Sequence, residues 1–440
     1  MVSIQELYEL FLQNPKVTKD TREEVKGSIY FALTGPNFNG NKFAEEALAQ
    51  GAAYAVVDDL SVLNQPDHPK LLHVENVLRS LQQLASFHRD HIQAPVLAIT
   101  GSNGKTTTKE LVAKVLSKKF KVHYTKGNYN NHIGLPLTIL QIHPKVEFVV
   151  LEMGASAQNE IAGYCTIAKP DYGLITNVGR AHLEGFGGEE GVRKGKGELY
   201  DYLAKNQGVV FVNSDEPFLD RMAQRVSDRM SYHSGAQAQT SKKNIAIQLV
   251  RTEPNVICRF RGNDQQEYMI ESTLMGRHNF MNIMSAVAVG TYFEVPDLQI
   301  KRAIELYQPT NNRSQIFRFE GVKYVKDAYN ANPDSMKSMV QSFAAWKDPH
   351  KVLVLGDMLE LGSASEEAHQ QIVDLVTQLQ NIEEVYLVGD QFCKTLAPSK
   401  VRKYLTVDAL LKEWRHAMFR GKTVLLKGSR GIALEKLVDL

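Results

Sequence analysis

The chain has 440 residues, of which 43% are hydrophobic and 23% charged, and its formal net charge at pH 7 is +2. This length predicts two or three domains, and the small net charge argues against a surface that binds nucleic acid. The widely spaced Cys165, Cys258 and Cys393 argue against a disulfide framework and indicate a reducing compartment. We expect a cytoplasmic protein, because we find neither a signal peptide nor an apolar run of about 18 residues.

The first part of the chain, residues 1–92, mixes short strands and helices. Apolar runs predict strands at 27–33 and 52–59, and helical periodicity predicts helices at 42–52 and 77–89.

Residues 93–307 show a different pattern, in which predicted buried strands end in loops and are separated by predicted helices. The predicted strands lie at 93–100, 146–154, 171–179 and 208–215. This alternation predicts a mostly parallel sheet with helices on its faces.

The rhythm restarts after residues 306–314, LYQPTNNRS. Strands are predicted at 321–329, 351–358, 383–390 and 422–429, and helices at 335–346, 365–380 and 407–419. The pattern predicts a separate α/β domain of about 130 residues.

The segment 98–110, AITGSNGKTTTKE, carries the strongest chemical signal. It places two glycines, Lys105 and Thr106 between a predicted strand and a predicted helix whose apolar face contains Leu111, Val112, Val115, Leu116 and Phe120. Glycines let backbone amides approach phosphate oxygens, the lysine can reach the β- and γ-phosphates, and the threonine hydroxyl can bind Mg²⁺. The usual P-loop spacing would place its first glycine at Ile99, so a glycine turn with an exposed lysine is the alternative.

Two further strand ends carry candidate ligands. Glu152 ends one buried run, where P-loop enzymes place a metal-binding carboxylate, and His182 follows the next. The ends of parallel strands share one edge of a sheet, so both side chains could face one pocket. Without the phosphate loop, Glu152 would be read as a solvated loop residue. In the same way, Lys194, Lys196 and Glu198 would be read as surface residues of a helix.

Seven motifs together resemble the Mur ligase family over nearly the whole chain. In chain order they are TGSNGKTTTKE, EMGAS, NVGRAHLEGFGG, KGKGELY, GRHNFMN, DAYNANPDSM and VLGDMLELG. In this family the phosphate loop reads Gly-x-x-Gly-Lys-Thr, so Gly101 takes the place that Ile99 cannot. The resemblance implies three α/β domains. Residues 1–92 would bind a UDP-sugar, residues 93–307 would form the P-loop ATP-binding parallel sheet, and residues 308–440 would form a Rossmann-like domain.

The resemblance also implies roles for individual residues. The implied ATP-binding residues are Gly101, Ser102, Asn103, Gly104, Lys105, Thr106, Thr107, Asn279, Asn282, Arg313, Asp327, Tyr329 and Asn330, with His278 on the adenine side. The implied metal ligands are Thr106, Glu152, His182 and Lys196, the last as a carbamate. The implied catalytic residues are Lys105, Lys196, His182 and Arg313, with Arg313 reaching the γ-phosphate.

The substrate-binding residues implied in the same way are Asp20, Thr21, Arg22, Phe31, Ala32, Asn130, Asn131 and Asn332. Gly27 and Leu33 match the same uridine-nucleotide segment as the first five. The family often has Asp-Gly-His just after this segment, whereas this chain has Asn39-Gly40-Asn41.

The implied activity is ATP-driven amide ligation through an acyl phosphate, with ATP and Mg²⁺ as cofactors. The motifs favour members that join D-alanyl-D-alanine to a UDP-N-acetylmuramoyl-tripeptide in cell-wall peptidoglycan synthesis, and the family implies a monomer. The Asp-Asn-Pro-Arg string of the members that add the third peptide residue is absent. A folylpolyglutamate synthase, an ATP-binding relative without catalytic activity and a P-loop GTPase are further alternatives. The last lacks the Asn-Lys-x-Asp signature.

Overall fold

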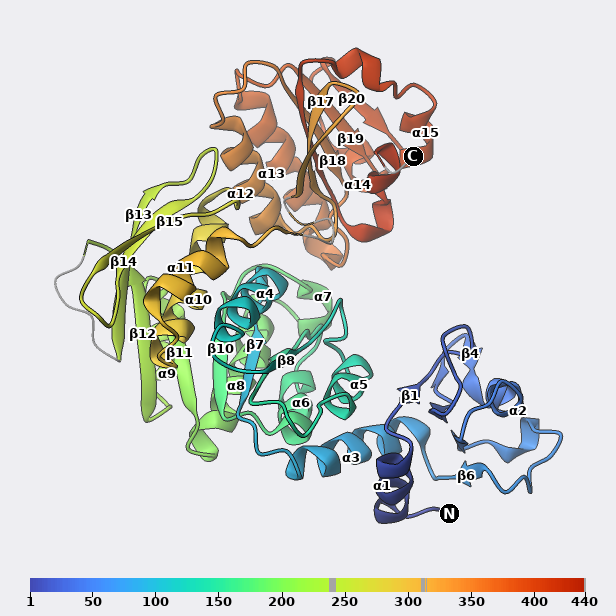
Figure 1. The fold of residues 1–440 in the computed structure, drawn as a ribbon. Coiled ribbons are helices and arrows are strands. Elements are labelled where there is room, and N and C mark those ends of the chain that lie inside the picture. The colour runs from blue at the N-terminus through green and yellow to red at the C-terminus, as the bar shows by residue number, and fades with distance from the viewer. Residues whose placement is uncertain (237–242, 310–312, 314, 439–440) are drawn as a thin grey trace. The chain divides into compact units, whose positions relative to one another are not determined.

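Helices and strands alternate throughout the part of the chain that this computed structural model describes, residues 1–236, 243–309, 313 and 315–438 (Figure 1). The predicted α/β class is confirmed. The chain divides into two units, which are Met1–Ala98, Phe120–Ala155 and Asn159–Tyr172 in the first, and Ile99–Lys119, Ser156–Gln158 and Gly173–Leu440 in the second.

The first unit begins with a four-stranded parallel sheet in the order β1-β2-β5-β6. Its strands are β1 (Val17–Thr18), β2 (Ile29–Phe31), β5 (Tyr54–Val57) and β6 (Leu71–His73), and the hairpin β3 (Thr34–Gly35) and β4 (Phe38–Asn39) follows β2. The helices here are α1 (Ile4–Gln13), α2 (Ala44–Ala49) and α3 (Val77–Asp90), with 3-10 turns η1 (Gly40–Phe43) and η2 (Leu60–Val62). The strands and helices expected within residues 1–92 are therefore confirmed.

The remainder of the first unit contains buried parallel strands with helices. The elements are β7 (Val96–Thr100, whose last two residues belong to the second unit), β8 (Val122–Tyr124), α5 (Gly134–Leu140), β9 (Phe148–Glu152) and α6 (Glu160–Ala168), with strand order β7-β9-β8. Every residue of β7 and β9 is buried, as is typical of parallel strands covered on both faces. Helix α3 packs against α1, α5 and α6.

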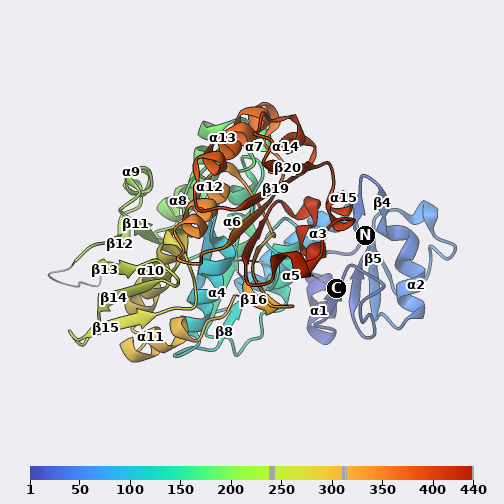
Figure 2. The ribbon, with the colours of Figure 1, turned by 90° about the horizontal axis from the view of Figure 1, so that it is seen from above.

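The second unit contains the helix that follows β7 and a sheet in the order β10-β11-β12-β13-β14-β15. Its first elements are α4 (Lys105–Leu116), β10 (Tyr172–Ile175), α7 (Leu183–Phe186), α8 (Glu189–Lys205), β11 (Val209–Asn213), α9 (Pro217–Ala223), β12 (Asp228–Ser234), β13 (Asn244–Arg251), β14 (Ile257–Arg261), β15 (Glu267–Glu271), α10 (Arg277–Tyr292) and α11 (Asp297–Glu305). Strands β11, β12 and β13 are parallel, whereas β14 and β15 are antiparallel to their neighbours. Figure 2 shows β13, β14 and β15 beside α10 and α11, and α10 packs closely on α4.

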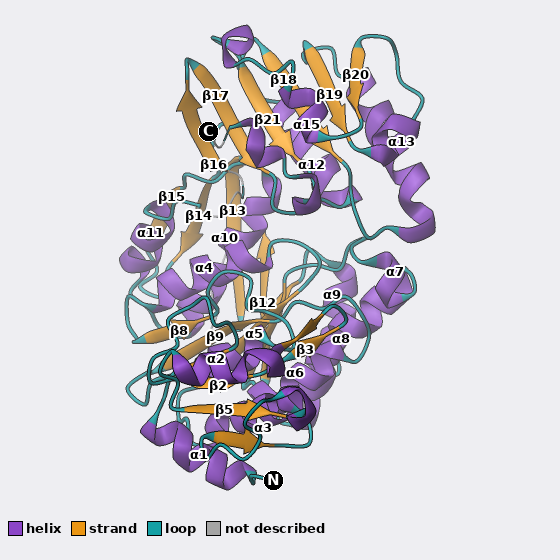
Figure 3. Cartoon of the chain, turned by 90° about the vertical axis from the view of Figure 1, so that its right-hand side faces the viewer, coloured by secondary structure: helices purple, strands orange, loops and turns teal. Residues whose placement is uncertain are grey.

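The last part of the second unit is a six-stranded sheet in the order β16-β17-β21-β18-β19-β20, parallel except for β16 (Figure 3). Its elements are β16 (Gln315–Phe319), β17 (Val322–Asp327), α12 (Pro333–Ala344), β18 (Lys351–Gly356), η3 (Gly362–Ala364), α13 (Ser365–Gln378), β19 (Glu384–Val388), α14 (Asp390–Lys394), β20 (Val401–Tyr404), α15 (Val407–Leu411), η4 (His416–Phe419), β21 (Thr423–Lys427), η5 (Arg430–Ile432) and η6 (Leu434–Leu437).

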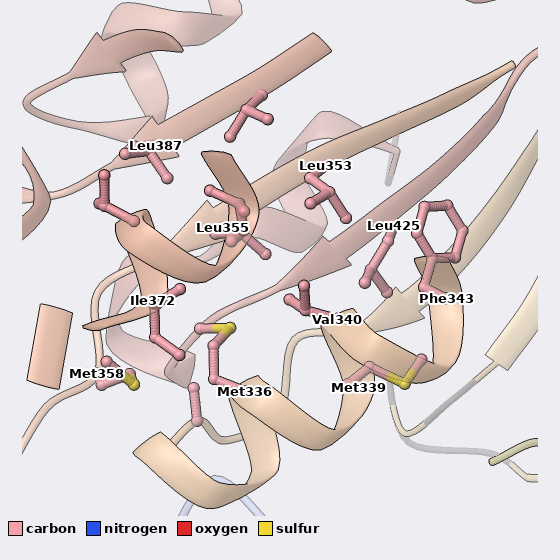
Figure 4. Packing of buried hydrophobic residues seen from close by; sticks show 14 of the residues in the cluster. Met336, Met339, Val340, Phe343, Leu353, Leu355, Met358, Ile372, Leu387 and Leu425 are labelled. Carbon is pink, nitrogen blue, oxygen red and sulfur yellow. The ribbon is translucent and has the colours of Figure 1, made fainter. Parts of the chain in front are cut away.

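Apolar side chains fill both faces of this sheet. On one face Met336, Val340 and Phe343 of α12 point toward Leu353 and Leu425 of the strands (Figure 4). A second cluster, containing residues of α15, η4 and η6, covers the other face. The parallel sheet is thus covered on both sides, as such sheets require.

Three local expectations are wrong. The helix expected at 407–419 is the short α15 followed by η4, because Trp414 and Phe419 turn into the core and pack against each other with ring centroids 4.4 Å apart. Helix α4 ends at Leu116, so Phe120 does not lie on its face; the Ser117 hydroxyl donates to the carbonyl of Ala113 and helps to end the helix. The last sheet has two edge strands, β16 and β20, beyond the four expected, and β12 to β15 have no counterpart in the predicted elements.

None of the helices in the described residues is long and apolar enough to cross a membrane.

Candidate functional site

The loop between β7 and α4 is built around two glycines with positive φ, Gly101 (140°) and Gly104 (79°). A Cβ atom on Gly101 would lie 2.0 Å from the Thr176 Oγ1 atom, and one on Gly104 would lie 2.4 Å from the Asn282 Oδ1 atom. Any side chain would therefore clash at both positions. The loop leaves backbone amides at the start of α4, which is the feature that binds phosphate in nucleotide sites.

The segment after β10 supports this loop. The backbone amides of Ser102 and Asn103 donate to the Asn177 carbonyl (3.0 Å) and to its Oδ1 atom (2.9 Å). The Ser102 hydroxyl donates to the Gly179 carbonyl (3.0 Å) and accepts from the Gly179 amide (2.9 Å). Ser102 is one of the expected ATP-binding residues, and its hydroxyl is used here to shape the loop.

Lys105, the first residue of α4, curls back over the loop. Its ammonium group donates to the carbonyls of Gly101 (2.7 Å) and Ser102 (3.1 Å). Thr106 is buried and Thr107 is half-buried beside it. The lysine thus places its charge over the glycine loop, where a phosphate would be bound.

Helix α10 carries the expected adenine-side residues, and its asparagines connect it to α4. The Thr108 hydroxyl donates to Asn282 Oδ1 (3.1 Å), and the Asn282 amide donates to Asn279 Oδ1 (2.9 Å). Burial lowers the pKa of the neighbouring His278, and Lys427 acts in the same direction while Asp327 opposes it. The asparagines therefore support the loop from behind, and His278 favours its neutral form.

The strand ends of the last sheet bring together the other expected nucleotide residues. The Lys427 ammonium, almost fully buried, donates to Asp327 (2.7 Å) and more weakly to the Asn330 carbonyl (3.4 Å). The Arg313 guanidinium lies 4.0 Å from the centre of the Tyr329 ring.

Two residues at the start of α12 contact the central loops. The Asn332 side-chain amide donates to Asn103 Oδ1 (2.7 Å), and its Oδ1 atom caps α12 by accepting from the Ser335 amide (2.9 Å). Next to it, Asp334 accepts from the Arg180 backbone amide (2.8 Å). Asn332, an expected substrate contact, is therefore hydrogen-bonded to the phosphate loop here.

His182 lies within electrostatic range of both Lys105 and Lys196. Burial is the largest cause that lowers the pKa of His182, the two lysine charges lower it further, and Glu360, which accepts a hydrogen bond from His182 Nδ1, opposes them. His182 has a positive φ of 54° and immediately precedes α7.

Lys196 is 1% exposed on α8, with its nitrogen 4.8 Å from the centre of the Phe186 ring, whereas Lys194 is exposed and Glu198 half-buried. The reading of Lys196 as a surface residue is therefore wrong.

Glu152 and Asn130 lie in the first unit. Glu152 is 1% exposed, and its Oε1 atom accepts from the Asn130 amide (2.7 Å). The alternative of a solvated loop glutamate is therefore wrong. Asn131 accepts from the Gly134 amide (2.8 Å) at the start of α5.

The expected uridine-nucleotide residues lie around β2. Arg22 hydrogen-bonds to both carboxylate oxygens of Asp20 (2.8 and 2.6 Å) and is the main cause that lowers the Asp20 pKa to about 2. Thr21 is half-buried between them, and the side chains of Phe31 and Ala32 are fully buried.

The departure from the family pattern at Asn41 has a structural role. Asn41 is fully buried, donates to Asp58 Oδ1 (2.8 Å) and accepts from the Asp58 backbone amide (3.0 Å).

No group of three or more His, Cys, Asp or Glu residues in the described chain is arranged to hold a metal ion. Mg²⁺ is commonly held by one or two carboxylates together with waters and substrate phosphates. Glu152 in the first unit and Thr106 in the second each carry an oxygen atom of a kind that Mg²⁺ binds.

Sequence reasoning assigned no role to Glu360, Asp334, Arg180 or Lys427. The first three lie inside motifs that carried the resemblance, which was the available signal. Their partners are 100 or more residues away along the chain, so spacing could not have revealed them.

A buried strand, a glycine loop and a helix that begins with lysine define a P-loop nucleotide-binding protein. Comparison with known proteins is more specific. A Mur ligase middle domain model matches residues 99–290, and a model of the Mur ligase glutamate ligase domain matches residues 312–430. The chain belongs to the Mur ligase family.

Similar relatives span the whole chain. UDP-N-acetylmuramoyl-tripeptide–D-alanyl-D-alanine ligase of Bacillus subtilis is 33% identical, covering 99% of this chain and 96% of that protein. The protein of the same name from Escherichia coli is 33% identical, covering 96% and 92%. Among solved structures, MurF from Acinetobacter baumannii has a TM-score of 0.83 at 26% identity, covering 99% and 97%. MurF ligase from Thermotoga maritima, in complex with ADP, has a TM-score of 0.82 at 26% identity, covering 97% of each chain.

Proposed function

We propose that this chain is the ATP-dependent ligase that joins D-alanyl-D-alanine to UDP-N-acetylmuramoyl-tripeptide, releasing ADP and phosphate. It acts as a monomer in the cytoplasm, in the synthesis of the peptidoglycan precursor on which cell shape and division depend. The observation that carries this proposal is the glycine phosphate loop with Lys105 folded over it, in a chain similar over its full length to ligases of that name.

The phosphate loop binds the triphosphate through its backbone amides. The loop residues and Thr107 line this site, and His278, with Asn279 and Asn282 behind it, lies on the adenine side. Asp327, Tyr329 and Asn330 bind the ribose side of the nucleotide. The ion pair of Asp327 with buried Lys427 supports this role, because it holds the carboxylate in place at the end of β17, where its oxygens can accept hydroxyl hydrogen bonds.

The tripeptide carboxylate attacks the γ-phosphorus of ATP, the bond to the β-phosphate oxygen breaks, ADP leaves, and the carboxylate becomes an acyl phosphate. The amine of D-alanyl-D-alanine then attacks that carbonyl carbon, and phosphate leaves. Each step builds negative charge on oxygen, which Lys105 and Arg313 stabilise electrostatically. Closure of the last domain over the nucleotide excludes water that would hydrolyse the acyl phosphate.

Thr106, Glu152, His182 and carbamylated Lys196 would hold Mg²⁺. The ion supplies charge neutralisation at the phosphate oxygens. The burial of Lys196 and its closeness to His182 support its carbamylation, because the modification would turn a cation near a proposed metal ligand into an anion that can bind the metal.

The remaining assignments concern the substrates and the domain limits. Asp20, Thr21, Arg22, Phe31 and Ala32 form the UDP-sugar site, with Phe31 and Ala32 contributing their backbone. Asn130, Asn131 and Asn332 approach the peptide substrates. The domains are residues 1–92, 93–307 and 308–440, a division supported by the three large sheets, which lie within residues 17–73, 96–271 and 315–427.

A phosphate-release assay tests the function. With ATP, Mg²⁺ and UDP-N-acetylmuramoyl-tripeptide, we expect phosphate release on addition of D-alanyl-D-alanine and none with single amino acids. Release with UDP-N-acetylmuramoyl-dipeptide and a single amino acid, but not with the dipeptide D-alanyl-D-alanine, would reassign the chain to the ligase that adds the third residue. No release under any condition would indicate a relative without catalytic activity.

A further inference from the structure

The loop that follows β18, residues 357–362, presents one carboxylate to the central part of the second unit. We propose that Glu360 is a positioning residue. It accepts the Nδ1 proton of His182, fixes the ring in the tautomer with a free Nε2 atom, and so prepares His182 as a ligand for Mg²⁺. This inference rests on the proposed function, since it assigns a partner to a residue of that site.

Hydrogen bonds of Asp357, Met358 and Leu359 to neighbouring segments hold the first half of this loop in place. The buried Asp357 carboxylate accepts from the Gln391 (2.8 Å) and Phe392 (2.9 Å) amides at the start of α14. The Met358 amide donates to His369 Nε2 (3.0 Å), and the Leu359 amide donates to the Ser429 hydroxyl (3.0 Å). Hydrogen bonds from three neighbouring elements thus fix the backbone just before Glu360.

The backbone at both ends of the contact adopts an uncommon conformation. Glu360 has a φ of 63° and His182 a φ of 54°, a region that residues other than glycine rarely occupy. Gly362 lies so close to Glu184 that a Cβ atom on it would be 3.3 Å from the Glu184 Cβ atom. Residues held in such conformations cluster at functional sites when the surrounding structure fixes them.

The hydrogen bond itself selects the tautomer of His182. A carboxylate only accepts, so the Nδ1 atom that contacts Glu360 Oε2 must carry the proton. Its Nε2 atom then has a lone pair that could be donated to a metal ion. Histidines that bind metals commonly donate their other N–H to a carboxylate or a carbonyl in this way.

The surroundings give the carboxylate a second and smaller role. His182 lies within range of the cationic Lys105, so a negative charge at Glu360 offsets the repulsion that Lys105 exerts on a bound cation. Glu360 belongs to the last sheet domain, whose Asp334 and Asn332 contact the neighbouring central loops. Docking of that domain would therefore complete the environment of His182.

The experiment compares Glu360→Ala with Glu360→Gln, because the glutamine side-chain oxygen can still accept the Nδ1 proton. Glu366→Ala, an exposed position at the start of α13, is the matched control. The first readout is the ¹⁵N chemical shifts of the His182 ring in the ligand-free, ¹⁵N-histidine-labelled full chain. We expect wild type, E360Q and E366A to show the Nδ1–H tautomer, and E360A to show a mixture of tautomers.

The second readout is kinetic. E360A should lower kcat about 10- to 100-fold, as loss of an outer partner of a metal ligand does, and should weaken binding of Mn²⁺ measured in the presence of ADP. E360Q should stay within a few-fold of wild type, and the KM for D-alanyl-D-alanine should not change. Should E360A fail to fold, E360M removes the acceptor and serves in its place.

Two results would overturn the inference. One is a His182 tautomer that is unchanged in E360A or E360M. The other is an E360Q variant as impaired as E360A with a raised KM for D-alanyl-D-alanine, which would assign Glu360 to the ammonium group of that substrate. Failure of the wild type to release phosphate would contradict the proposed function and leave the tautomer measurement as a test of the contact.

Discussion

Two loops of the second unit each follow a buried parallel strand, but the shape of each loop is fixed in a different way. The loop at 101–104, after β7, is shaped by glycine backbones, and the proposed function assigns phosphate binding to its main-chain amides and to Lys105. The loop at 357–362, after β18, is held by buried side chains and presents a single carboxylate. The comparison teaches that a loop which binds phosphate needs space near its backbone, whereas a loop which orients another side chain needs rigid anchors.

The largest effect should come from the one charged group of the glycine loop. Lys105→Ala should lower kcat by at least about 10²–10³-fold, because the charge that stabilises the transferring phosphoryl group is lost. The midpoint of thermal unfolding should change little, since Lys105 is half-buried and donates to carbonyls of its own loop. Lys118→Ala, at an exposed position just beyond the end of α4, is the control. Retained turnover in K105A would count against the assignment of the whole site.

A smaller effect should come from the backbone of the same loop. Gly101→Ala should lower the free energy of unfolding by about 1–3 kcal/mol and weaken ADP binding, because the added Cβ meets Thr176. Gly421→Ala is the matched control, since Gly421 also has a positive φ (77°) but has no atom within 4 Å of the added Cβ. It should cost about 1 kcal/mol and leave ADP binding unchanged. Urea unfolding and ADP titration measure both, and equal effects of the two variants would show that the contact with Thr176 is unimportant.

The smallest effect should be a pH dependence of stability that comes from His369. This histidine anchors the loop at 357–362, which we call the anchored loop. Burial lowers the pKa of His369, although Ser365 and Asp357 oppose the shift. Below about pH 6.5, the pKa of an unperturbed histidine, the unfolded chain therefore binds more protons at this position, and the free energy of unfolding falls as pH falls. The contribution is at most about 1.4 kcal/mol per pH unit.

His369→Gln isolates the contribution of His369 to the pH dependence of the free energy of unfolding. Glutamine can accept a hydrogen bond from the Met358 amide but does not titrate. Between pH 7.5 and pH 5.5, H369Q should lose less stability in urea unfolding than wild type does. Identical losses would show that His369 does not titrate between these pH values.

The glycine loop could be predicted because its information is local. Gly101, Gly104 and Lys105 lie within five residues, between an apolar run and a helical pattern, and each has one physical reason to be there. The buried strands of the last sheet were predictable for the same reason. The antiparallel strands β14 and β15 were not, since half-exposed strands with charged side chains lack a continuous apolar run.

The anchored loop could not be predicted, although its motif was visible. Asp357 and Glu360 are three residues apart in one string of letters. One is buried beneath a helix and the other is exposed toward His182, 178 residues earlier in the chain. Lys196 shows the same limit, because helical periodicity does not reveal that α8 buries this face.

The sequence by itself determined the α/β class, the phosphate loop and, through its motifs, the family. These follow from short-range patterns, because glycine conformation, helix starts and apolar runs act over a few residues. Only the tertiary structure decided that Lys196 is buried, that Asn282 supports the loop rather than faces solvent, and that Glu360 meets His182. Burial and such contacts depend on which distant segments pack together. The free energy of packing between distant segments leaves no pattern in the neighbouring residues of the sequence.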